Sequence, residues 1–347
     1  MILQVHSDLL FSFLRIGIGD MMNKNQRRNL DMKIVSSFFP SRKIQEELKL
    51  KYPNIHFQFN KEIKDADPYL SEAEVFLTYG EDLTEEHIRK AKKLKWIMVV
   101  SAGIDKMPLG VCRENGIIVT NARGVHKIPM AEYTLGMMLH HVKQIKTLML
   151  REQEESWDRK VPMDELHGKT IFILGVGAIG GEIARLCKAF GMNTLGVNRS
   201  GGSVPFVDDL YRMDEVQQVI SQADFIVSVL PSTHDTQHIL TGEHFQAMKK
   251  TAVFINIGRG NLVEEKVLLK ALAEKEFAHA YLDVFENEPL PEGHPFWKMN
   301  NVTVTPHLSS ITKNYLPRAF EIFEENLHTY VKKDRAFVNK IDLGRGY

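Results

Sequence analysis

The chain has 347 residues, of which 44% are hydrophobic and 25% are charged, and its 44 basic and 44 acidic side chains give a formal net charge of zero. This composition excludes a largely disordered chain. The balanced charge argues against a nucleic-acid-binding protein, for which an excess of basic residues is typical. At about 150 residues per domain, the length predicts two domains.

The cysteine content and the hydropathy pattern indicate a cytoplasmic protein. Cys112 and Cys187 are too few for a disulfide framework and suit a reducing compartment. No apolar run reaches the roughly 18 residues that a membrane-spanning helix needs. No group of His, Cys, Asp and Glu has the spacing of metal ligands. We therefore expect no metal site, no membrane association and no nucleic-acid partner.

Residues 1–31 do not show the pattern of a folded element. A polar run at 23–29 precedes the first strand pattern. Codons for Gln26, Arg27 and Arg28 can contain a bacterial ribosome-binding sequence, followed by three further codons and then that of Met32. We expect residues 1–31 to be a disordered or non-native leader upstream of a natural start at Met32. The alternative is a native flexible tail.

From Met32 onward, short β-rich runs alternate with helical patterns, as is typical of βαβ units and parallel sheets. Strands are predicted at 34–39, 55–59, 75–79, 96–100 and 117–120. A long helix is predicted at 129–155, where apolar residues recur at helical spacing. Further strands are predicted at 171–174, 194–197, 225–230, 253–257, 279–283 and 302–305, before a last helix at 316–332. The pattern predicts an α/β protein with two parallel-sheet domains.

A glycine-rich loop, Gly175-Val176-Gly177-Ala178-Ile179-Gly180, connects a predicted strand to a predicted helix. This context is the one in which G-x-G-x-x-G binds a dinucleotide. Gly175 permits the tight turn, Gly177 lets the backbone approach a pyrophosphate, and Gly180 lets the helix pack on the strand. Free N–H groups at the helix N-terminus then bind the pyrophosphate. The alternative is a glycine-rich turn without a ligand.

The strand after this loop ends at Asn198-Arg199-Ser200, where an NAD site usually has an acidic residue for the ribose 2′-hydroxyl. Asn198 removes the repulsion that a carboxylate exerts on a 2′-phosphate, and Arg199 can pair with that phosphate. We therefore favour NADP(H) over NAD(H) as the cofactor. The alternative is that Arg199 stacks on the adenine and both cofactors bind.

Three further segments each follow a predicted strand of the second series, at 256–260, 283–289 and 305–310. Ligands of open parallel sheets bind beyond the carboxyl ends of the strands. Arg259, Glu288 and His307 are therefore expected to converge beside the nicotinamide. Each of them taken alone is more often a structural or solvated residue, as we expect of His140, His141, His234 and His244.

The chemistry of these three residue types is coherent. Reduction of a 2-keto acid needs a hydride at carbon and a proton at oxygen, and a histidine can donate that proton near neutral pH. A neighbouring carboxylate favours the imidazolium form and fixes the ring orientation. An arginine can hold the substrate carboxylate and stabilise the developing negative charge. Arg259, Glu288 and His307 thus predict a keto-acid reductase.

Together these motifs resemble the D-isomer-specific 2-hydroxyacid dehydrogenase family. Arg259 stands in a segment similar to the family's GRG, Glu288 in one similar to its DVFxxEP, and His307 in one similar to its TPH. The resemblance runs from about residue 91 to residue 330. It implies an Arg-Glu-His catalytic set and an NAD(P)-dependent enzyme that acts on a small 2-keto or 2-hydroxy acid. It also implies a homodimer.

The resemblance further implies two Rossmann-like, doubly wound parallel-sheet domains, with the cofactor domain inserted into the substrate domain. The substrate domain would comprise residues 32–128 and 305–347, and the dinucleotide-binding domain residues 129–304. The two long helices would then be the crossovers between them.

Further site residues follow from the resemblance. Ala102 and Gly103 lie in a segment, 101–105, that is similar to the family loop whose amides hold the substrate carboxylate; the alternative is an ordinary turn. Asp283 matches the residue that binds the nicotinamide carboxamide. Tyr79 follows a strand and is a weaker candidate for the substrate side chain. The remaining expected cofactor contacts are Leu230, Pro231, Thr236, Ile257, Gly258 and Ser309.

Within the family, a reductase of glyoxylate or hydroxypyruvate is the leading interpretation. A phosphoglycerate dehydrogenase is the first alternative, although many of these carry a C-terminal regulatory domain that we do not expect here. Formate dehydrogenases replace the glutamate of the Glu-His pair with a neutral amide, so Glu288 argues against that activity. A nucleotide-sensing corepressor with the same fold is an alternative of a different class.

Overall fold

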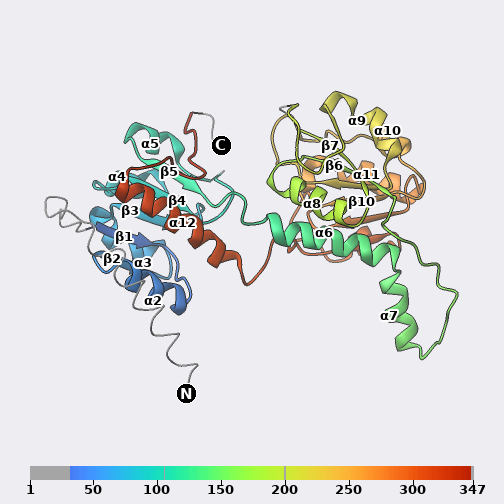
Figure 1. Ribbon diagram of the computed structural model, residues 1–347, viewed down its shortest axis with the longest axis horizontal. Coiled ribbons are helices and arrows are strands. Elements are labelled where there is room, and N and C mark those ends of the chain that lie inside the picture. The colour runs from blue at the N-terminus through green and yellow to red at the C-terminus, as the bar shows by residue number, and fades with distance from the viewer. Residues whose placement is uncertain (1–31, 105, 199–200, 345–347) are drawn as a thin grey trace, which may run out of the picture. The chain divides into compact units, whose positions relative to one another are not determined.

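A computed structural model describes residues 32–104, 106–198 and 201–344, and the expected leader at 1–31 lies outside them (Figure 1). The chain divides into two compact units. Among the described residues, one unit comprises residues 32–123 together with 316–344, and the other comprises residues 124–315. These boundaries differ from the predicted ones at 128 and 304, and they place His307 in the same unit as Arg259 and Glu288.

The first unit is built on a parallel sheet in the order β2-β1-β3-β4-β5, with β1 at the point where the order reverses. Its strands are β1 (Met32–Ser36), β2 (Ile55–Phe59), β3 (Val75–Thr78), β4 (Trp96–Val99) and β5 (Ile118–Asn121). Its helices are α2 (Arg42–Lys51), α3 (Ile63–Ala66), α4 (Glu85–Lys90), α5 (Leu109–Glu114) and α12 (Tyr315–Lys332).

Both faces of this sheet are covered, which explains why β3 and β4 carry only buried side chains. On one face, Phe76 and Ile97 belong to a core cluster with Ile88 of α4 and Val111 of α5. On the other face, Trp96 stacks on Phe323 of α12 with ring centroids 5.5 Å apart. The returning C-terminal helix is therefore part of the core of the first unit.

The second unit has a seven-stranded parallel sheet in the order β12-β11-β10-β9-β6-β7-β8. Its strands are β6 (Thr170–Leu174), β7 (Asn193–Val197), β8 (Asp209–Tyr211), β9 (Phe225–Ser228), β10 (Val253–Asn256), β11 (His279–Leu282) and β12 (Val302–Val304). The order reverses between β6 and β9, so the glycine-rich loop after β6 lies at the topological switch point, where ligands of such sheets bind.

Helices cover both faces of this second sheet. They are α6 (Lys127–Val142), α7 (Ile145–Gln153), α8 (Ala178–Ala189), α9 (Val216–Val219), α10 (Gly242–Ala247) and α11 (Glu265–Ala273). Met138 of α6 and Ile183 of α8 share one core cluster with Ile171 of β6. Phe245 of α10 and Phe254 of β10 belong to a second cluster. The predicted doubly wound α/β fold is thereby confirmed.

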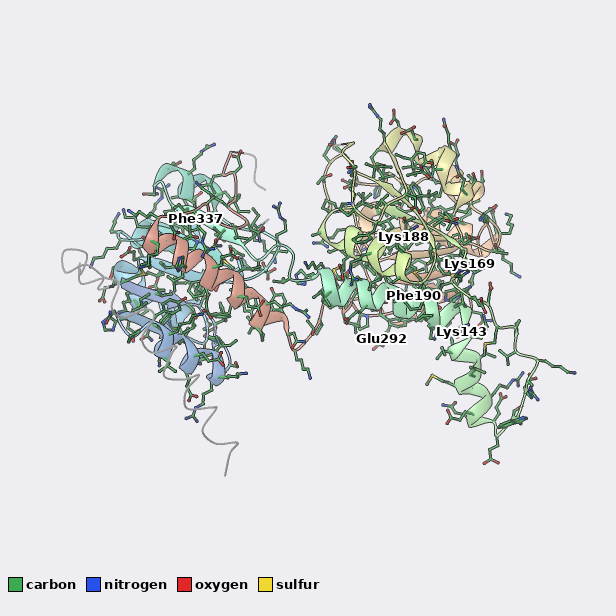
Figure 2. The ribbon with its side chains drawn as sticks, in the orientation of Figure 1. Lys143, Lys169, Lys188, Phe190, Glu292 and Phe337 are labelled. Atoms are coloured by element: carbon green, nitrogen blue, oxygen red, sulfur yellow. The ribbon has the colours of Figure 1, made fainter. Side chains whose placement is uncertain are left out.

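The predicted single helix at 129–155 is wrong, because the chain forms two helices, α6 and α7. Gln144 adopts the left-handed conformation, with φ of 50°, and so ends the helical path. Lys143, at the junction of the two helices in Figure 2, donates from Nζ to the carbonyl of Asp164 at 2.8 Å. The amide of Asp164 donates in turn to the carbonyl of Val142. A tertiary hydrogen bond thus pairs the carbonyl of Val142, the last residue of α6.

One strand was not predicted. β8 has three residues and is an edge strand, so it is too short to show an alternating pattern. Within the part of the chain that the structure describes, no helix is long and apolar enough to span a membrane.

Candidate active site

The glycine-rich turn after β6 has the geometry of a dinucleotide cradle. Gly175 has φ of 105°, a conformation that residues with a Cβ rarely adopt. A Cβ on Gly180 would lie 2.2 Å from the carbonyl oxygen of Gly175, so only glycine fits where α8 meets β6. A Cβ on Gly177 would meet nothing within 4 Å. The backbone here is open to an incoming group, next to Ala178 and Ile179 at the N-terminus of the twelve-residue α8.

Asn198, at the end of β7, closes the next loop. Its Nδ2 donates to the carbonyl of Gly202 at 3.1 Å, and its Oδ1 accepts from the amide of Gly201 at 2.7 Å. The expected cofactor residues Arg199 and Ser200 lie outside the described residues. The structure therefore defines the position of Asn198 and leaves the phosphate contact as a prediction.

The loops that follow β9 and β10 lie against each other. Thr236 Oγ1 donates to the carbonyl of Pro231 at 2.6 Å and closes the first loop. A Cβ on Gly258 would lie 2.7 Å from the carbonyl oxygen of Leu230, so the two backbones approach closely. Ile257 is buried beneath them. Leu230, Pro231, Thr236 and Gly258 thus share the edge of the sheet at which β6 ends.

Glu288 and His307 form the contact that the sequence predicted. Nδ1 of His307 lies 2.7 Å from Oε2 of Glu288. The other carboxylate oxygen, Oε1, accepts from the amide of Phe285 at 3.0 Å, which fixes the orientation of the carboxylate. Because Nδ1 faces the carboxylate, Nε2 is left as the atom that can donate to a substrate. The His307 side chain is 46% exposed.

Asp283 holds the loop that carries His307. Its side chain is fully buried, and Oδ1 accepts from the amide of Leu308 while Oδ2 accepts from the amide of Ser309, both at 2.9 Å. Oδ1 also accepts from Thr305 Oγ1 at 2.6 Å. The structure thus shows Asp283 and Ser309 in a loop-fixing arrangement, and contact of either with the nicotinamide carboxamide stays a prediction.

Arg259 lies at the end of β10, in a turn shaped by Asn256. Asn256 Nδ2 donates to the carbonyl of Arg259 at 3.0 Å, and Oδ1 accepts from the amide of Gly258 at 3.2 Å. The guanidinium of Arg259 donates through Nη1 to the carbonyl of Gly258 at 2.8 Å rather than to Glu288 or His307. The remaining N–H groups of the exposed side chain are those that could pair with a substrate carboxylate.

Tyr79, Ala102 and Gly103 belong to the first unit, at the carboxyl ends of β3 and β4. Ser101 Oγ lies 2.9 Å from the carbonyls of both Tyr79 and Gly103 and so connects the two turns. Asn121 Nδ2 donates to the carbonyl of Ala102 at 2.7 Å. Tyr79 packs on Phe38 with centroids 4.8 Å apart and remains 39% exposed. These three residues thus form one cluster within their own unit.

Two residues near the site were not predicted from the sequence. Burial lowers the pKa of His126. A hydrogen bond to the Ser310 backbone opposes this shift, and the charge of Arg259 adds to it. His126 therefore lies close to both Ser310 and Arg259. The hydroxyl of Tyr133 lies 2.6 Å from Thr305 Oγ1. A sequence signal for Tyr133 exists, because it precedes His140 by seven residues and so shares a face of α6 with it.

The expectation for the four other histidines is partly wrong. His234 is exposed, and His244 accepts from the amide of Thr241 at the start of α10, as a cap residue does. His140 and His141, however, pack inside the unit. His140 Nδ1 lies 2.8 Å from the hydroxyl of Tyr281, and the His141 ring contacts those of Tyr281 and His279. The α6 face that bears them is covered by β11, which the sequence of α6 alone does not show.

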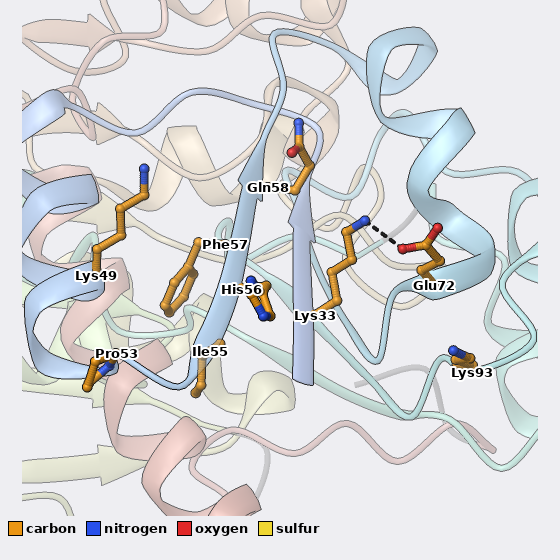
Figure 3. A pocket seen from close by; sticks show the side chains of 9 residues that line it. All are labelled: Lys33, Lys49, Pro53, Ile55, His56, Phe57, Gln58, Glu72 and Lys93. Atoms are coloured by element: carbon orange, nitrogen blue, oxygen red, sulfur yellow. Dashed lines mark hydrogen bonds and ion pairs between the residues drawn. The ribbon is translucent and has the colours of Figure 1, made fainter. Parts of the chain in front are cut away.

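A pocket of about 580 Å³ in the first unit contains none of the predicted site residues (Figure 3). It lies along the edge strand β2, beside the amino-terminal part of β1, and Lys33 pairs there with Glu72 at 2.8 Å. The motifs described above follow the carboxyl ends of strands. The pocket is therefore separate from the candidate active site.

The comparisons with known proteins agree with this geometry. The family description "D-isomer specific 2-hydroxyacid dehydrogenase, NAD binding domain" matches residues 135–309. The chain belongs to the D-isomer specific 2-hydroxyacid dehydrogenase family. A glyoxylate reductase of Thermofilum pendens is 31% identical over 298 residues, which are 83% of this chain and 86% of that protein. The chain spans about half the length of the D-3-phosphoglycerate dehydrogenases that it matches.

Solved structures of the family have the same fold. A D-isomer specific 2-hydroxyacid dehydrogenase family protein from Aeromonas salmonicida is 32% identical with a TM-score of 0.79, covering 90% of this chain and 99% of that chain. A D-isomer specific 2-hydroxyacid dehydrogenase from Xanthobacter autotrophicus, in complex with NADPH and MES, is 26% identical with a TM-score of 0.74. That comparison covers 91% of this chain and all of the other.

Proposed function

We propose that this dehydrogenase reduces a small 2-keto acid to the D-2-hydroxy acid with a nicotinamide cofactor. The observation that carries the proposal is the 2.7 Å contact between His307 and Glu288, in the unit that also holds the glycine-rich turn. The cradle of Gly175, Gly177 and Gly180 suits a pyrophosphate at the N-terminus of α8. A dinucleotide bound there would supply the hydride for the keto carbon.

In this mechanism the protein holds the substrate and moves one proton. Nε2 of the protonated His307 donates to the keto oxygen, and Glu288 stabilises the imidazolium through Nδ1. Arg259 turns from the Gly258 carbonyl to pair with the substrate carboxylate and stabilises the negative charge that develops on oxygen. In the first unit, the amides of Ala102 and Gly103 are proposed to bind a carboxylate.

Glyoxylate and hydroxypyruvate are the proposed substrates, supported by the glyoxylate reductase relatives. The alternative, 3-phosphohydroxypyruvate, is supported by the 34% identity to a D-3-phosphoglycerate dehydrogenase. Steady-state rates with these three keto acids, each with NADPH and NADH, test the proposal. The reductase proposal predicts the highest kcat/KM for glyoxylate or hydroxypyruvate. No turnover of any short 2-keto acid, with tight cofactor binding retained, would instead favour a nucleotide-sensing protein.

We further propose that NADP(H) is preferred over NAD(H). Asn198 stands where a ribose-binding carboxylate is usual, and Arg199 follows it. A bidentate arginine contributes about 1.5–3 kcal/mol toward a 2′-phosphate, which corresponds to a roughly ten- to hundredfold preference. The double change Asn198→Asp and Arg199→Ala is expected to reverse the kcat/KM ratio toward NADH. A wild-type enzyme with higher kcat/KM for NADH would contradict the proposal.

We also propose that the protein is a homodimer, as the family resemblance implies. The segment 145–163, which we name the arm, is a surface suited to a second copy. None of the nine residues of α7 is buried. Exposed apolar side chains gather on the arm: Ile145, Met149, Leu150, Trp157 and Met163.

A further inference from the structure

Four hydrogen bonds connect helix α6, through Thr305 and Asp283, to the loop of the proposed proton donor. Tyr133 on α6 lies 2.6 Å from Thr305 Oγ1, and Thr305 Oγ1 lies 2.6 Å from Asp283 Oδ1. The Asp283 carboxylate accepts hydrogen bonds from the amides of Leu308 and Ser309, the two residues that follow His307. A continuous chain of hydrogen bonds thus runs from helix α6 to the loop that carries the His307 imidazole.

The direction of each bond follows from the number of protons available. The buried carboxylate of Asp283 is an acceptor, so Thr305 must give its single hydroxyl proton to it. Thr305 can then only accept from Tyr133, whose phenol therefore donates. Burial is the main reason that the pKa of Tyr133 is raised to about 12, which keeps the phenol protonated at neutral pH.

The loop needs such a restraint. His307 has φ of 52°, a left-handed conformation that is unfavourable for a residue other than glycine. Its amide donates to the Asp283 carbonyl at 2.8 Å, and the amides after it donate to the Asp283 carboxylate. The orientation of Asp283 therefore sets the position of His307, and Thr305 and Tyr133 fix the orientation of Asp283.

We propose that Tyr133 is a positioning residue for the proton donor, acting through Thr305 and Asp283 on the backbone of the His307 loop. Tyr133 touches neither His307 nor Glu288 in any hydrogen bond within the described residues. The inference rests on the proposed reductase function only for its kinetic readout. Because this chain of hydrogen bonds ends on the loop that carries His307, the reactivity of that imidazole gives a second readout that does not require turnover.

The test compares Tyr133→Phe with Tyr281→Phe. Tyr281 is the control, because it is a buried tyrosine on β11 whose hydroxyl lies 2.8 Å from His140 Nδ1 and makes no hydrogen bond to Asp283 within the described residues. Tyr133→Phe is expected to lower kcat about tenfold, while KM for the keto acid stays unchanged. Tyr281→Phe is expected to leave kcat unchanged. Both variants are expected to lower Tm by similar amounts, because each loses one tyrosine hydroxyl.

Variants of Thr305 test whether the effect of Tyr133 on kcat passes through the hydrogen bonds of Thr305. Thr305→Val removes the hydroxyl and is expected to lower kcat as Tyr133→Phe does, whereas Thr305→Ser keeps the hydroxyl and most of the activity. The double variant Tyr133→Phe/Thr305→Val is expected to lose no more than Thr305→Val alone, because both changes break one chain. Additive losses would overturn the proposal, as would a kcat of Tyr133→Phe equal to that of the control.

The second readout is the rate at which diethyl pyrocarbonate acylates His307, followed by peptide mass spectrometry at neutral pH. A less restrained loop is expected to react at least about twofold faster in Tyr133→Phe than in the wild type, with no change in Tyr281→Phe. An unchanged rate in Tyr133→Phe would overturn the proposal. If the wild type reduces no keto acid but this difference is found, the positioning role stands and the proposed function alone fails.

Discussion

His307 is fixed by its backbone as well as by its carboxylate partner. Its left-handed conformation, with φ of 52°, lets the amides of residues 307–309 converge on Asp283. Nδ1 simultaneously faces Glu288. Asparagine tolerates the same backbone conformation and has no group that can donate a proton at neutral pH. It is therefore the substitution that separates the chemistry of His307 from its place in the fold.

We expect His307→Asn to lower kcat by about two to four orders of magnitude, the usual range for the loss of a general acid. Cofactor binding should remain nearly unchanged, because none of the described contacts of the Gly175 turn involves His307. Stopped-flow turnover and a fluorescence titration with the cofactor measure the two quantities. Near-normal turnover would show that another group donates the proton.

The carboxylate of Glu288 has a separable electrostatic role. Glu288→Gln keeps an oxygen that can accept from the Phe285 amide but removes the negative charge beside Nδ1 of His307. Keto-acid reduction is then expected to decline at lower pH than in the wild type, because a neighbouring carboxylate stabilises the charged form of a general acid of this type. The measurement is kcat/KM against pH, with a deuterated cofactor to establish that chemistry limits the rate. An unmoved profile would reject the pairing.

At the scale of single residues, the sequence indicated the candidate site residues that follow strands. It did not indicate those that come from the α6 region. Arg259, Glu288 and His307 each come just after a strand, and parallel strands bring their ends to one edge. Tyr133 and His126 reach the site from the α6 region. Their approach depends on how α6 packs over β11 and β12, which local sequence patterns do not specify.

At the scale of elements, α6 and α7 show why helix length was overestimated. Lys143 and Gln144 are good helix formers, so no local signal marks a break between them. The break is made by Asp164, which bonds the end of α6 through its amide and accepts from Lys143 through its carbonyl. Such a contact between residues some twenty positions apart in the chain is visible only in the folded structure.

The packing of α6 on β11 also makes the second unit sensitive to acid. His279 lies 2.9 Å from Thr303 Oγ1, and its ring contacts those of His141 and Tyr281. Burial, with added repulsion from His141, Lys146 and His140, lowers the pKa of His279 to about 3. The unfolded chain therefore takes up a proton here at higher pH than the folded one, so stability is full above about pH 6.5 and declines as the pH falls toward 3.

We expect His279→Gln to flatten this decline. Between pH 6 and 4 the wild type should lose up to about 1.4 kcal/mol of folding free energy per pH unit through this one site, and the variant should not. Thermal unfolding midpoints across that range measure the difference. His234→Gln is the matched control, because His234 is fully exposed. If the unfolding midpoint falls equally steeply with pH in His279→Gln and in the wild type, His279 takes up its proton without unfolding.

At the scale of the whole molecule, the chain enters the second unit after Arg123 and returns to the first at Leu316. The family resemblance implies an insertion of the dinucleotide-binding domain, residues 129–304, into the substrate domain. It gives the return to the substrate domain at residue 305. The segment after β12 instead stays in the second unit, where Asp283 binds residues 308 and 309. That side-chain contact carries no local sequence signal.

Polar contacts of Asp164 attach the arm to the second unit. Asp164 accepts from Lys143 through its carbonyl and from Lys169 through its carboxylate, both at 2.8 Å, and the hydrogen bond from Lys169 is the main reason that the pKa of Asp164 is lowered. Between these anchors, the exposed fraction of the side chain reaches 93% at Trp157 and 56% at Met149. Large apolar side chains exposed together on one segment indicate a protein–protein contact.

We expect the wild type to be a dimer in solution and the variant Met149→Lys/Trp157→Ser to be a monomer. Loss of a buried tryptophan anchor costs about 2 kcal/mol or more, which weakens the dimer at least about thirtyfold. Light scattering coupled to size exclusion over a concentration series measures this. Leu50→Lys is the control, because Leu50 is 85% exposed on α2 in the first unit and lies outside the arm. A variant that stays dimeric would assign the interface to another surface, and a monomeric wild type would reject the homodimer itself.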